Sequence, residues 1–406
     1  MRYCFEIISL LSIFLLTFGL SGCILLDEDK SFAWPEVTES ECNFDNNKNL
    51  TCSPYLDGFN VPHMSAIHPE NDELWIIDLN GLILSWDGSS LFKVANLSFL
   101  ISNCHFEQGL LGFAFDENFN TTNQVLLSYV KRGPCDGDNE SNLFLASAII
   151  DNSGILNISS IIIIQEIYQP YRNHNGGYLQ SIGDNKYLWG IGDGGGSLDP
   201  HSNAQDTSTP LGTIQLFSFI DNDIYPVLGE TNSDSLVLHK GLRNPWRFDF
   251  DNNNNRLWVT DVGEKCWEEV NLLLINESAN LGWPKREGLH KVHSNGYTNE
   301  NGTCYYDEDA PLVSNDFTDP IASYIHEGGN CSITGGFWMN WGPKSLQDGY
   351  LYGDFCTGSI WILRDIEGIW TDEYIGSFQG MIVGFGRGLS DEILIFTWDG
   401  SIYSLN

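Results

Sequence analysis

YLWGIGD at residues 187–193 and RLWVTD at residues 256–261 decide the expected fold, because the same short pattern returns along the chain. Each copy is an apolar strand, usually with an aromatic residue, and it is often followed by a turn that contains Gly or Asp. Six copies occur, at residues 73–78, 124–130, 187–193, 256–261, 350–354 and 392–397.

Several copies continue through a tight turn into a second strand, as in LNGLILSW (79–86) and WDGSIYSL (398–405). Long amphipathic helices are hard to find. Repeated strand–turn–strand units are typical of stacked four-stranded sheets, so the sequence predicts an all-β, six-bladed β-propeller over residues 41–406. A β-sandwich or a two-domain all-β chain is the alternative, but six similar strands without a linker favour one closed domain.

The charge is strongly negative. Among 406 residues, 54 are Asp or Glu and 19 are Lys or Arg, which gives a formal net charge of −35. This field repels a polyanion, so we expect no nucleic-acid partner. The acidic residues are spread along the chain rather than gathered in a tail, as on an ordinary solvated surface.

The N-terminus predicts export. Residues 1–22 have one early Arg, an apolar stretch and then small residues, which together indicate a signal peptide. Leu20-Ser21-Gly22-Cys23 resembles a bacterial lipobox, in which Cys23 is lipidated and becomes the new N-terminus. Residues 23–40 would then form a tether, and the lipid would be the only contact with a membrane. An ordinary secreted chain is the alternative.

Export also changes how the cysteines are interpreted. Without Cys4 and Cys23, eight remain, an even number that favours disulfides in an oxidising compartment. The sequence contains no CxxC pair, the spacing that would suggest a zinc site. Pairing of nearest neighbours is our hypothesis for the connectivity: Cys42–Cys52, Cys104–Cys135, Cys266–Cys304 and Cys331–Cys356.

Polar, Gly-rich clusters indicate where function lies. They are FEQGLLGFAFDENF (106–119), RNHNGGYL (172–179) with GIGDGGGSLDP (190–200), GLRNPWRFDFD (241–251) with TDVGEKCWEEVN (260–271), and EGGNCSITGGFW (327–338) with GDFCTGSIW (353–361). In this order, from about Leu56 to the C-terminus, they resemble the glucose/sorbosone dehydrogenase family. That family includes soluble sugar dehydrogenases that use pyrroloquinoline quinone (PQQ), and its domain also occurs in Hedgehog-interacting-protein-like proteins.

The resemblance implies that His174 is the general base, which takes a hydroxyl proton of a sugar while hydride passes to PQQ. An imidazole suits this task because its ordinary pKa lies near neutrality. The following Gly176 and Gly177 would let the backbone approach a flat cofactor. Without the flanking motifs, a histidine in a tight turn is more often structural.

The resemblance also assigns Arg243 as the catalytic cation that polarises the quinone oxygen, with Asn244 beside it. An ordinary Arg–carboxylate pair is the alternative for Arg243. Asp193 matches a family Asp among the cofactor-binding residues, although it could equally form a turn. Gly263 and Glu264 lie where the family holds calcium, partly through backbone oxygens, but acidic loops are common in this chain.

Departures from the family pattern weaken the case for PQQ. Glu107 stands where PQQ enzymes carry Gln, and Asn173 where an Asp can precede the histidine. A family Lys aligns with Cys356, and of two family Args only Arg387 is retained. PQQ is a tricarboxylate, and each missing charge-assisted bond is worth about 1.5–3 kcal/mol. Lys344 or Arg364 could substitute, but nothing in the sequence demands it.

Two functions follow from these observations. The first is an exported aldose dehydrogenase that depends on PQQ and calcium. The alternative is a non-catalytic extracellular propeller that binds a carbohydrate or a protein at its mouth, as the Hedgehog-interacting-protein-like members do. The His, Arg and Asn favour chemistry, whereas the loss of cations favours binding.

Overall fold

The computed structural model describes residues 35–46, 48–135, 142–227, 235–292 and 316–406. Strands dominate these ranges, with one short helix, α1 (Phe119–Thr122), and one 3-10 turn, η1 (Asn203–Gln205). Among the described residues no helix has the length and apolar composition needed to cross a membrane.

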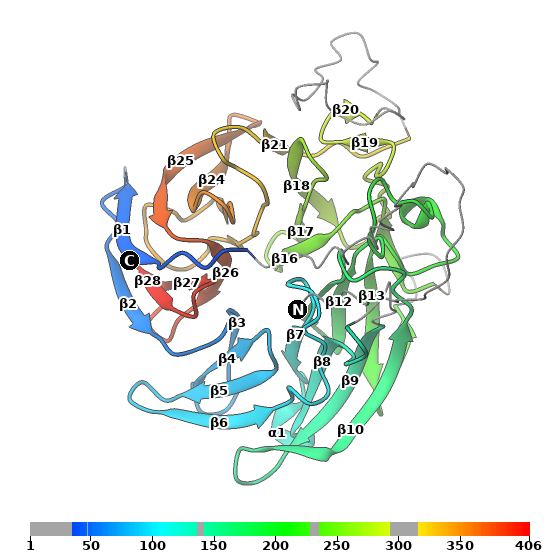
Figure 1. The fold of residues 1–406 in the computed structure, drawn as a ribbon, viewed down its shortest axis with the longest axis vertical. Helices are drawn as coiled ribbons and strands as arrows, with labels where there is room; N and C mark the ends of the chain where they lie inside the picture. The colour runs from blue at the N-terminus through cyan, green and yellow to red at the C-terminus, as the bar shows by residue number, and fades with distance from the viewer. Residues whose placement is uncertain (1–34, 47, 136–141, 228–234, 293–315) are drawn as a thin grey trace, which may run out of the picture. The chain divides into compact units, whose positions relative to one another are not determined.

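Six antiparallel sheets follow one another along the chain and form the blades of a propeller (Figure 1). Blade 1 holds β3 (Pro62–Ile67), β4 (Leu74–Asp78), β5 (Leu82–Trp86) and β6 (Leu91–Asn96). Blade 2 holds β7 (Leu110–Phe115), β8 (Gln124–Val130), β9 (Leu143–Ile150) and β10 (Leu156–Ile167). Blade 3 holds β11 (Gly176–Gly183), β12 (Lys186–Ile191), β13 (Thr213–Ile220), β14 (Asp223–Pro226) and β15 (Val237–Lys240).

The second half of the ring has the same organisation. Blade 4 holds β16 (Pro245–Asp251), β17 (Arg256–Asp261), β18 (Trp267–Leu274) and β21 (Ala322–Ile325). A small hairpin, β19 (Arg286–Glu287) and β20 (His290–Lys291), lies between β18 and β21 in the chain. Blade 5 holds β22 (Phe337–Trp338), β23 (Tyr350–Gly353), β24 (Ser359–Ile366), β25 (Ile369–Gln379) and β1 (Glu41–Asn46). Blade 6 holds β26 (Ile382–Arg387), β27 (Ile393–Thr397), β28 (Ile402–Leu405) and β2 (Cys52–Leu56).

The prediction of a six-bladed propeller is confirmed, with four strands in most blades. The six recurring stretches of the sequence are the second strands of the six blades: β4, β8, β12, β17, β23 and β27. They recur because a second strand has sheet neighbours on both edges and other blades against its faces. All five residues of β4 and of β27 are buried.

Large aromatic side chains occupy equivalent positions in these second strands. Trp75, Trp189 and Trp258 each stand third in their copy of the pattern, and all three are fully buried. The ring of Trp258 stacks on Tyr350 of blade 5, with the ring centroids 4.8 Å apart. The aromatic residues of the repeat therefore fill the space between neighbouring blades.

The two ends of the described chain close the ring. β2, near the N-terminus, pairs with β28 at the C-terminus and completes blade 6, while β1 pairs with β25 of blade 5. The disulfide Cys42–Cys52 joins β1 to β2 and so links these two blades. Such closure leaves only short edges and removes the need for a separate capping element.

Three of the four predicted disulfides are confirmed: Cys42–Cys52, Cys104–Cys135 and Cys331–Cys356. Cys266 is also disulfide-bonded, but Cys304 lies outside the described residues. The predicted signal peptide at residues 1–22 and the lipidation site at Cys23 lie outside them as well. Residues 35–40, the described part of the predicted tether, contain no strand or helix.

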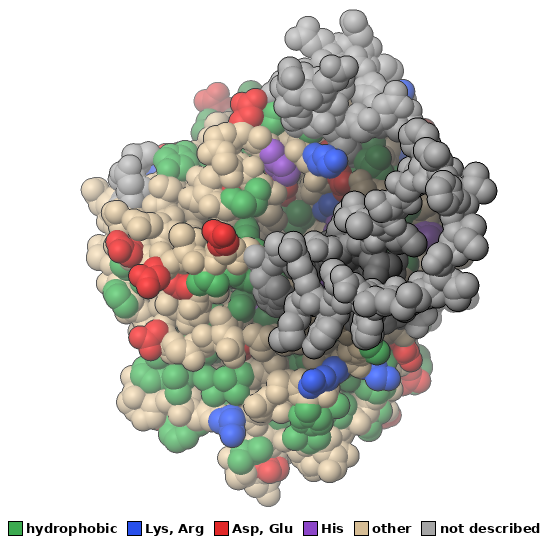
Figure 2. Space-filling model, in the orientation of Figure 1, with side chains coloured by type: hydrophobic (Ala, Val, Ile, Leu, Met, Phe, Trp, Pro, Cys, Tyr) green, Lys and Arg blue, Asp and Glu red, His purple; other side chains and the backbone are tan. Residues whose placement is uncertain are grey.

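Acidic side chains are distributed over the face of the molecule that Figure 2 presents, rather than gathered in one patch. This agrees with the even spread of Asp and Glu along the sequence. The acidic side chains of this face therefore mark no binding site by themselves, and the candidate site is found from the buried polar residues.

Candidate functional site

The candidate site lies at one end of the ring, where the chain enters the innermost strands. We call this end the mouth and define it by the segments that precede β7, β11 and β16 (105–109, 172–175 and 241–244) and the turns that follow β12 and β17 (192–197 and 262–266). Because the innermost strands run side by side in the same direction, residues that precede them in different blades meet at one end.

His174 and Asp193 form the centre of this site. Nδ1 of His174 lies 2.7 Å from Oδ1 of Asp193, and both side chains are buried, with 3% and 0% of their surface exposed. Asp193 follows β12, the strand that pairs with β11, so the hairpin of blade 3 carries both residues. Since a carboxylate accepts hydrogen bonds, it holds the proton of the imidazole on Nδ1 and leaves Nε2 as an acceptor.

The backbone around His174 is unusual. Its φ of +55° lies in the left-handed region, which residues with a Cβ rarely adopt. Its N–H donates to Oε2 of Glu107 at 2.6 Å, and Nδ2 of Asn244 donates to the same oxygen at 3.2 Å. The N–H of Gly176 in turn donates to Oδ1 of Asn244 at 3.1 Å. Glu107 and Asn244 therefore hold the tight turn that presents the imidazole.

Asp193 is itself held in place by several donors. Nε1 of Trp283 donates to Oδ2 at 2.8 Å, and the N–H of Gly195 donates to Oδ1 at 2.8 Å. With both oxygens occupied, the carboxylate cannot rotate away from His174. In the described part of the chain no group bonds to Nε2 of His174, so this nitrogen is available to a ligand at the mouth.

Arg243 is a buried ion-pair residue. Its Nε and one terminal nitrogen donate to Oε2 of Glu264 at 3.1 and 2.8 Å, and a second terminal nitrogen donates to the carbonyl of Val262 at 3.2 Å. The guanidinium also lies 5.6 Å from the centre of the Trp283 ring. Burial acts to lower the pKa of Arg243, but Glu264 and Asp193 outweigh it and raise the pKa above its ordinary value. The Arg–carboxylate pair that the sequence left open is therefore present.

Glu264 is fully engaged through its side chain. Its Oε1 accepts from the hydroxyl of Ser197 at 2.6 Å, while Arg243 occupies Oε2. Burial acts to raise its pKa, but the guanidinium brings the pKa below its usual range. Gly263 donates its N–H to Glu268 at 3.2 Å. If calcium binds at residues 263 and 264, only their backbone carbonyls remain as ligands without displacing Arg243.

Two buried carboxyl groups, of Asp261 and Glu287, accept hydrogen bonds from the backbone of residues 243–244 and 264–267. Asp261 accepts the N–H groups of Arg243 and Asn244 at 2.8 and 2.7 Å, and burial raises its pKa to about 7. Glu287 accepts four successive N–H groups, beginning with Glu264 at 2.7 Å, through one oxygen. Together they fix the backbone on both sides of the Arg243–Glu264 pair.

The remaining predicted residues are divided between the two ends of the ring. Asn173 is at the mouth, where Oδ1 accepts from the N–H of Gly196 at 3.2 Å. That Arg387 binds the cofactor stays a prediction, and the structure places this residue apart from the other predicted residues. Arg387 is the last residue of β26, at the end away from the mouth, and its Nε donates to Asp391 at 2.7 Å. A six-residue strand spans about 17 Å, which separates it from His174.

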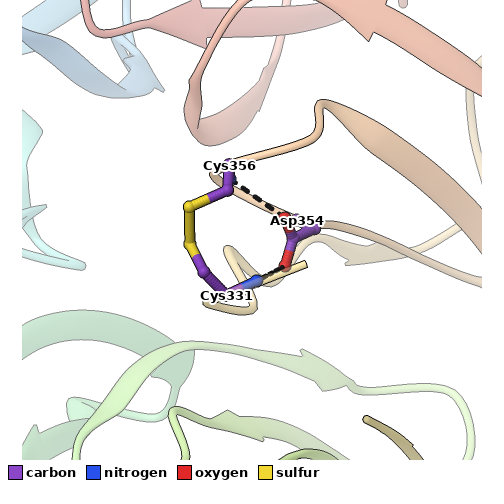
Figure 3. A group of neighbouring side chains, drawn as sticks. All are labelled: Cys331, Asp354 and Cys356. Carbon is purple, nitrogen blue, oxygen red and sulfur yellow. Dashed lines mark hydrogen bonds between the residues drawn. A yellow bond between two sulfur atoms is a disulfide. The ribbon is translucent and has the colours of Figure 1, made fainter. Parts of the chain in front are cut away.

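A disulfide and a carboxylate occupy the mouth side of blade 5. Asp354 accepts the backbone N–H groups of Cys331 and Cys356, each at 3.0 Å, and the two cysteines are bonded to each other (Figure 3). These three residues have the spacing of a metal site. The disulfide uses both sulfurs, and further N–H groups from Ser332 and Thr357 occupy the carboxylate. This group is therefore a structural clasp.

Some residues of the site were not identified from the sequence. Trp283, Asp261 and Glu287 fix the orientation of the predicted residues, yet each looks like an ordinary core or turn residue in its segment. No local pattern distinguishes them, because their partners are 17 to 90 positions away.

The fold and the site together define a class: a six-bladed propeller that carries an Asp-supported histidine and a buried arginine at its mouth. The family model for Glucose / Sorbosone dehydrogenase matches residues 59–341, and the chain belongs to this family.

The individual proteins that the chain resembles include a HIPL protein and a quinoprotein glucose dehydrogenase. The chain is 28% identical over 237 residues to the HIPL1 protein of Arabidopsis thaliana, a match that covers 52% of this chain and 32% of that protein. It is 22% identical over 303 residues to quinoprotein glucose dehydrogenase B of Acinetobacter calcoaceticus, with 69% and 62% covered. The chain thus spans about a third of the length of the first relative and somewhat under two thirds of the second.

Solved structures support the fold. The PQQ-bound form of aldose sugar dehydrogenase from Streptomyces coelicolor superimposes with a TM-score of 0.66 at 17% identity, over 89% of this chain and 99% of that one. At this level of identity the likeness concerns the fold alone.

Proposed function

We propose that this propeller binds a sugar at its mouth and that His174 takes a proton from one of the sugar's hydroxyl groups during oxidation. The observation that carries this proposal is the His174–Asp193 pair. It keeps Nδ1 protonated and leaves Nε2, the nitrogen that would accept the proton, without a described partner. Membership of a family named for sugar dehydrogenases and a relative named as a glucose dehydrogenase support the choice of a sugar.

His174 and Asp193 would divide the work in a defined way. A hydroxyl hydrogen-bonded to Nε2 would lose its proton to His174 while hydride from the same carbon passes to a bound two-electron acceptor of the quinone class. The alcohol carbon then becomes a carbonyl, and the imidazole becomes a cation. Asp193, 2.7 Å from Nδ1, would stabilise that cation electrostatically. Trp283 and Gly195 keep the carboxylate from turning toward the new proton.

The acceptor of the hydride in the quinoprotein relatives is PQQ, and the residues of this mouth do not fit it as they stand. The quinone carries three carboxylates, whereas the guanidinium of Arg243 is already paired with Glu264. Glu107 adds a further negative charge beside His174, and Arg387 lies at the other end of the blade. Calcium at the carbonyls of Gly263 and Glu264 would offset part of this charge, so PQQ with calcium remains the combination to test.

A second candidate is binding without turnover. The excess of carboxylates over free cations at the mouth favours a neutral ligand, such as a carbohydrate, over an anionic cofactor. The better-matching relative is a HIPL protein, so a protein partner at the mouth also belongs to this candidate.

The experiment titrates the purified full chain with a panel of aldoses by calorimetry, and then adds PQQ and calcium. A shift in quinone absorbance together with dye reduction supports oxidation. Sugar binding without turnover at tens of micromolar PQQ favours the binding function. If the chain shows neither sugar binding nor turnover, the proposal is refuted.

His174→Ala tests the role of the base. We expect turnover to fall by 10²-fold or more while the fold is retained. The matched control is His201→Ala, because His201 is exposed and its ring lies beside Tyr171, with the centroids 5.7 Å apart. If the two variants lose the same activity, His174 is not the base.

For the location of the protein, we propose export with a lipid on Cys23. Mass spectrometry of the mature N-terminus tests this directly. A diacylglyceryl group on Cys23 is expected, and an unmodified N-terminus at another residue contradicts the lipid anchor.

A further inference from the structure

A second arginine lies deeper in the ring than the candidate site. Arg247 is the third residue of β16, three positions beyond Asn244 and so about 10 Å along the strand from the mouth. It is 6% exposed. One terminal nitrogen donates to the carbonyl of Trp246 at 2.7 Å, and the other donates to Nδ1 of His63 at 2.5 Å and to its carbonyl at 3.4 Å.

Aromatic rings surround the guanidinium. Its central carbon lies 4.8 Å from the centre of the Tyr178 ring and 4.6 Å from that of Trp246. These contacts stabilise the cation through the ring faces. A guanidinium has five N–H donors, and the described hydrogen bonds use three of them.

Arg247 has no counter-ion among the described residues. No carboxylate there lies within 4.0 Å of it, in contrast to Arg243, which Glu264 neutralises. Asp249, two positions along the same strand, accepts from Nε2 of Gln180 at 2.9 Å and from the N–H of Trp338 at 2.8 Å. Burial lowers the pKa of Arg247 to about 10, so the group is still charged at neutral pH.

A small cavity adjoins this cation. Five of the six innermost strands contribute to its lining, which includes Ser65, Tyr178, Phe248, Phe337 and Phe385 beside Arg247. Its free space has room for about one water-sized species. Arg247 is the charged residue of this lining, so the cavity suits a negative occupant. The size excludes sulfate, phosphate, PQQ and sugars.

We propose that Arg247 and this cavity form a binding site for one small inorganic anion, a halide of about the size of chloride, inside the ring of innermost strands. The anion supplies the counter-charge that no described carboxylate provides, and it takes up N–H donors of Arg247 that the described hydrogen bonds leave over. An unpaired buried charge is strongly unfavourable, so an anion that neutralises it stabilises the folded chain. This site is independent of the proposed sugar chemistry, because Arg247 and His174 lie at different depths.

The test is the thermal unfolding of the full chain in chloride and in methanesulfonate, at equal ionic strength and with the same cation. Methanesulfonate is too large for the cavity and is not a sugar derivative. Replacing methanesulfonate with chloride raises the unfolding midpoint by about 2 °C if the site is filled. Crystals soaked in bromide show an anomalous peak beside the guanidinium of Arg247. If there is no peak and no difference between the anions, the proposal is wrong.

Arg247→Met removes the charge while it keeps most of the side-chain length, and we expect it to abolish the chloride effect. The matched control is Arg387→Met, since Arg387 is exposed and paired with Asp391. The control should keep the chloride effect in full. A chloride effect that survives in Arg247→Met overturns the assignment. If Arg247→Met fails to fold, the bromide peak in the unmodified chain decides.

Discussion

Replacing Asp193 with Asn perturbs the pair on which the proposed function depends while it keeps the shape of the side chain. Oδ1 of Asp193 contacts Nδ1 of His174 and accepts from the N–H of Gly195, and Oδ2 accepts from Nε1 of Trp283. An amide offers one oxygen and one nitrogen. Whichever way it turns, its NH₂ group meets a donor, either Gly195 or Trp283.

The magnitude follows from this arrangement. One buried N–H loses its acceptor, which costs about 1–3 kcal/mol, and the charge on Asp193 no longer supports the imidazole. We therefore expect Asp193→Asn to lower the free energy of unfolding by about 2 kcal/mol. With the NH₂ toward His174, the imidazole also changes tautomer, because Nδ1 must then accept. Its proton moves to Nε2, which can no longer act as a base.

Two assays check this reasoning. Urea unfolding measures the stability, and ¹⁵N NMR of the histidine side chains reports which ring nitrogen of His174 carries the proton. If the NH₂ turns to Trp283 instead, the tautomer is kept and the indole N–H resonance of Trp283 shifts. Turnover, where it is present, should fall by about 10²-fold or more when the tautomer changes.

The matched control is Asp251→Asn. Asp251 is equally buried and accepts from Asn253 and Asn254 at the far end of β16, away from the mouth. We expect a similar loss of stability with no change at His174. An Asp193→Asn protein with unaltered stability and unaltered His174 and Trp283 resonances would refute the reasoning.

Three further predictions concern stability. Burial, together with the charge of Asp261, raises the pKa of Glu269 to about 8, so its proton is held more tightly in the folded chain than in the unfolded chain. Stability should therefore fall as the pH rises from 5 to 8, by at most about 1.4 kcal/mol per pH unit, and Glu269→Gln should flatten this slope in unfolding curves recorded against pH. Gly177→Ala should lower the free energy of unfolding in urea by about 2 kcal/mol or more, because φ is +93° and the new Cβ would lie 2.6 Å from Cβ of Leu111. Gly154→Ala is the control for the backbone effect alone, since Gly154 has a positive φ but open space around the new Cβ. The double variant Cys331→Ser/Cys356→Ser should lose about 3 kcal/mol, as expected for a loop of 25 residues, and an unchanged melting temperature would contradict this.

The fold could be predicted from the repeated strand pattern of the sequence. A second strand is buried on both faces in every blade, so the requirement for an apolar, aromatic-rich run is local and returns six times, as at Trp75, Trp189 and Trp258. The turns could also be predicted locally, because Gly and Asp are favoured there by the backbone conformation of the turn itself. The disulfide Cys331–Cys356 could also be predicted, because its partners are close in the chain.

The family resemblance of the Gly-rich clusters located His174, Asp193, Arg243 and Asn244, which stand at the entrance to or exit from a blade strand. Their roles were not local. Whether Arg243 faces a ligand or a carboxylate depends on Glu264, 21 positions away, and Trp283 reaches Asp193 across 90 positions.

The sequence by itself determined the blade repeat, the acidic surface and the candidate residues at the mouth. Only the tertiary structure decided which of them meet. Strand direction sends Arg387 to the far end of β26, although its motif placed it among the cofactor residues. Closure of the ring brings residues of five innermost strands together around a cavity, and Arg247 lies in its lining. Hydrogen bonds and ion pairs act over a few ångströms, and the distance between two side chains is a property of the closed ring rather than of any segment.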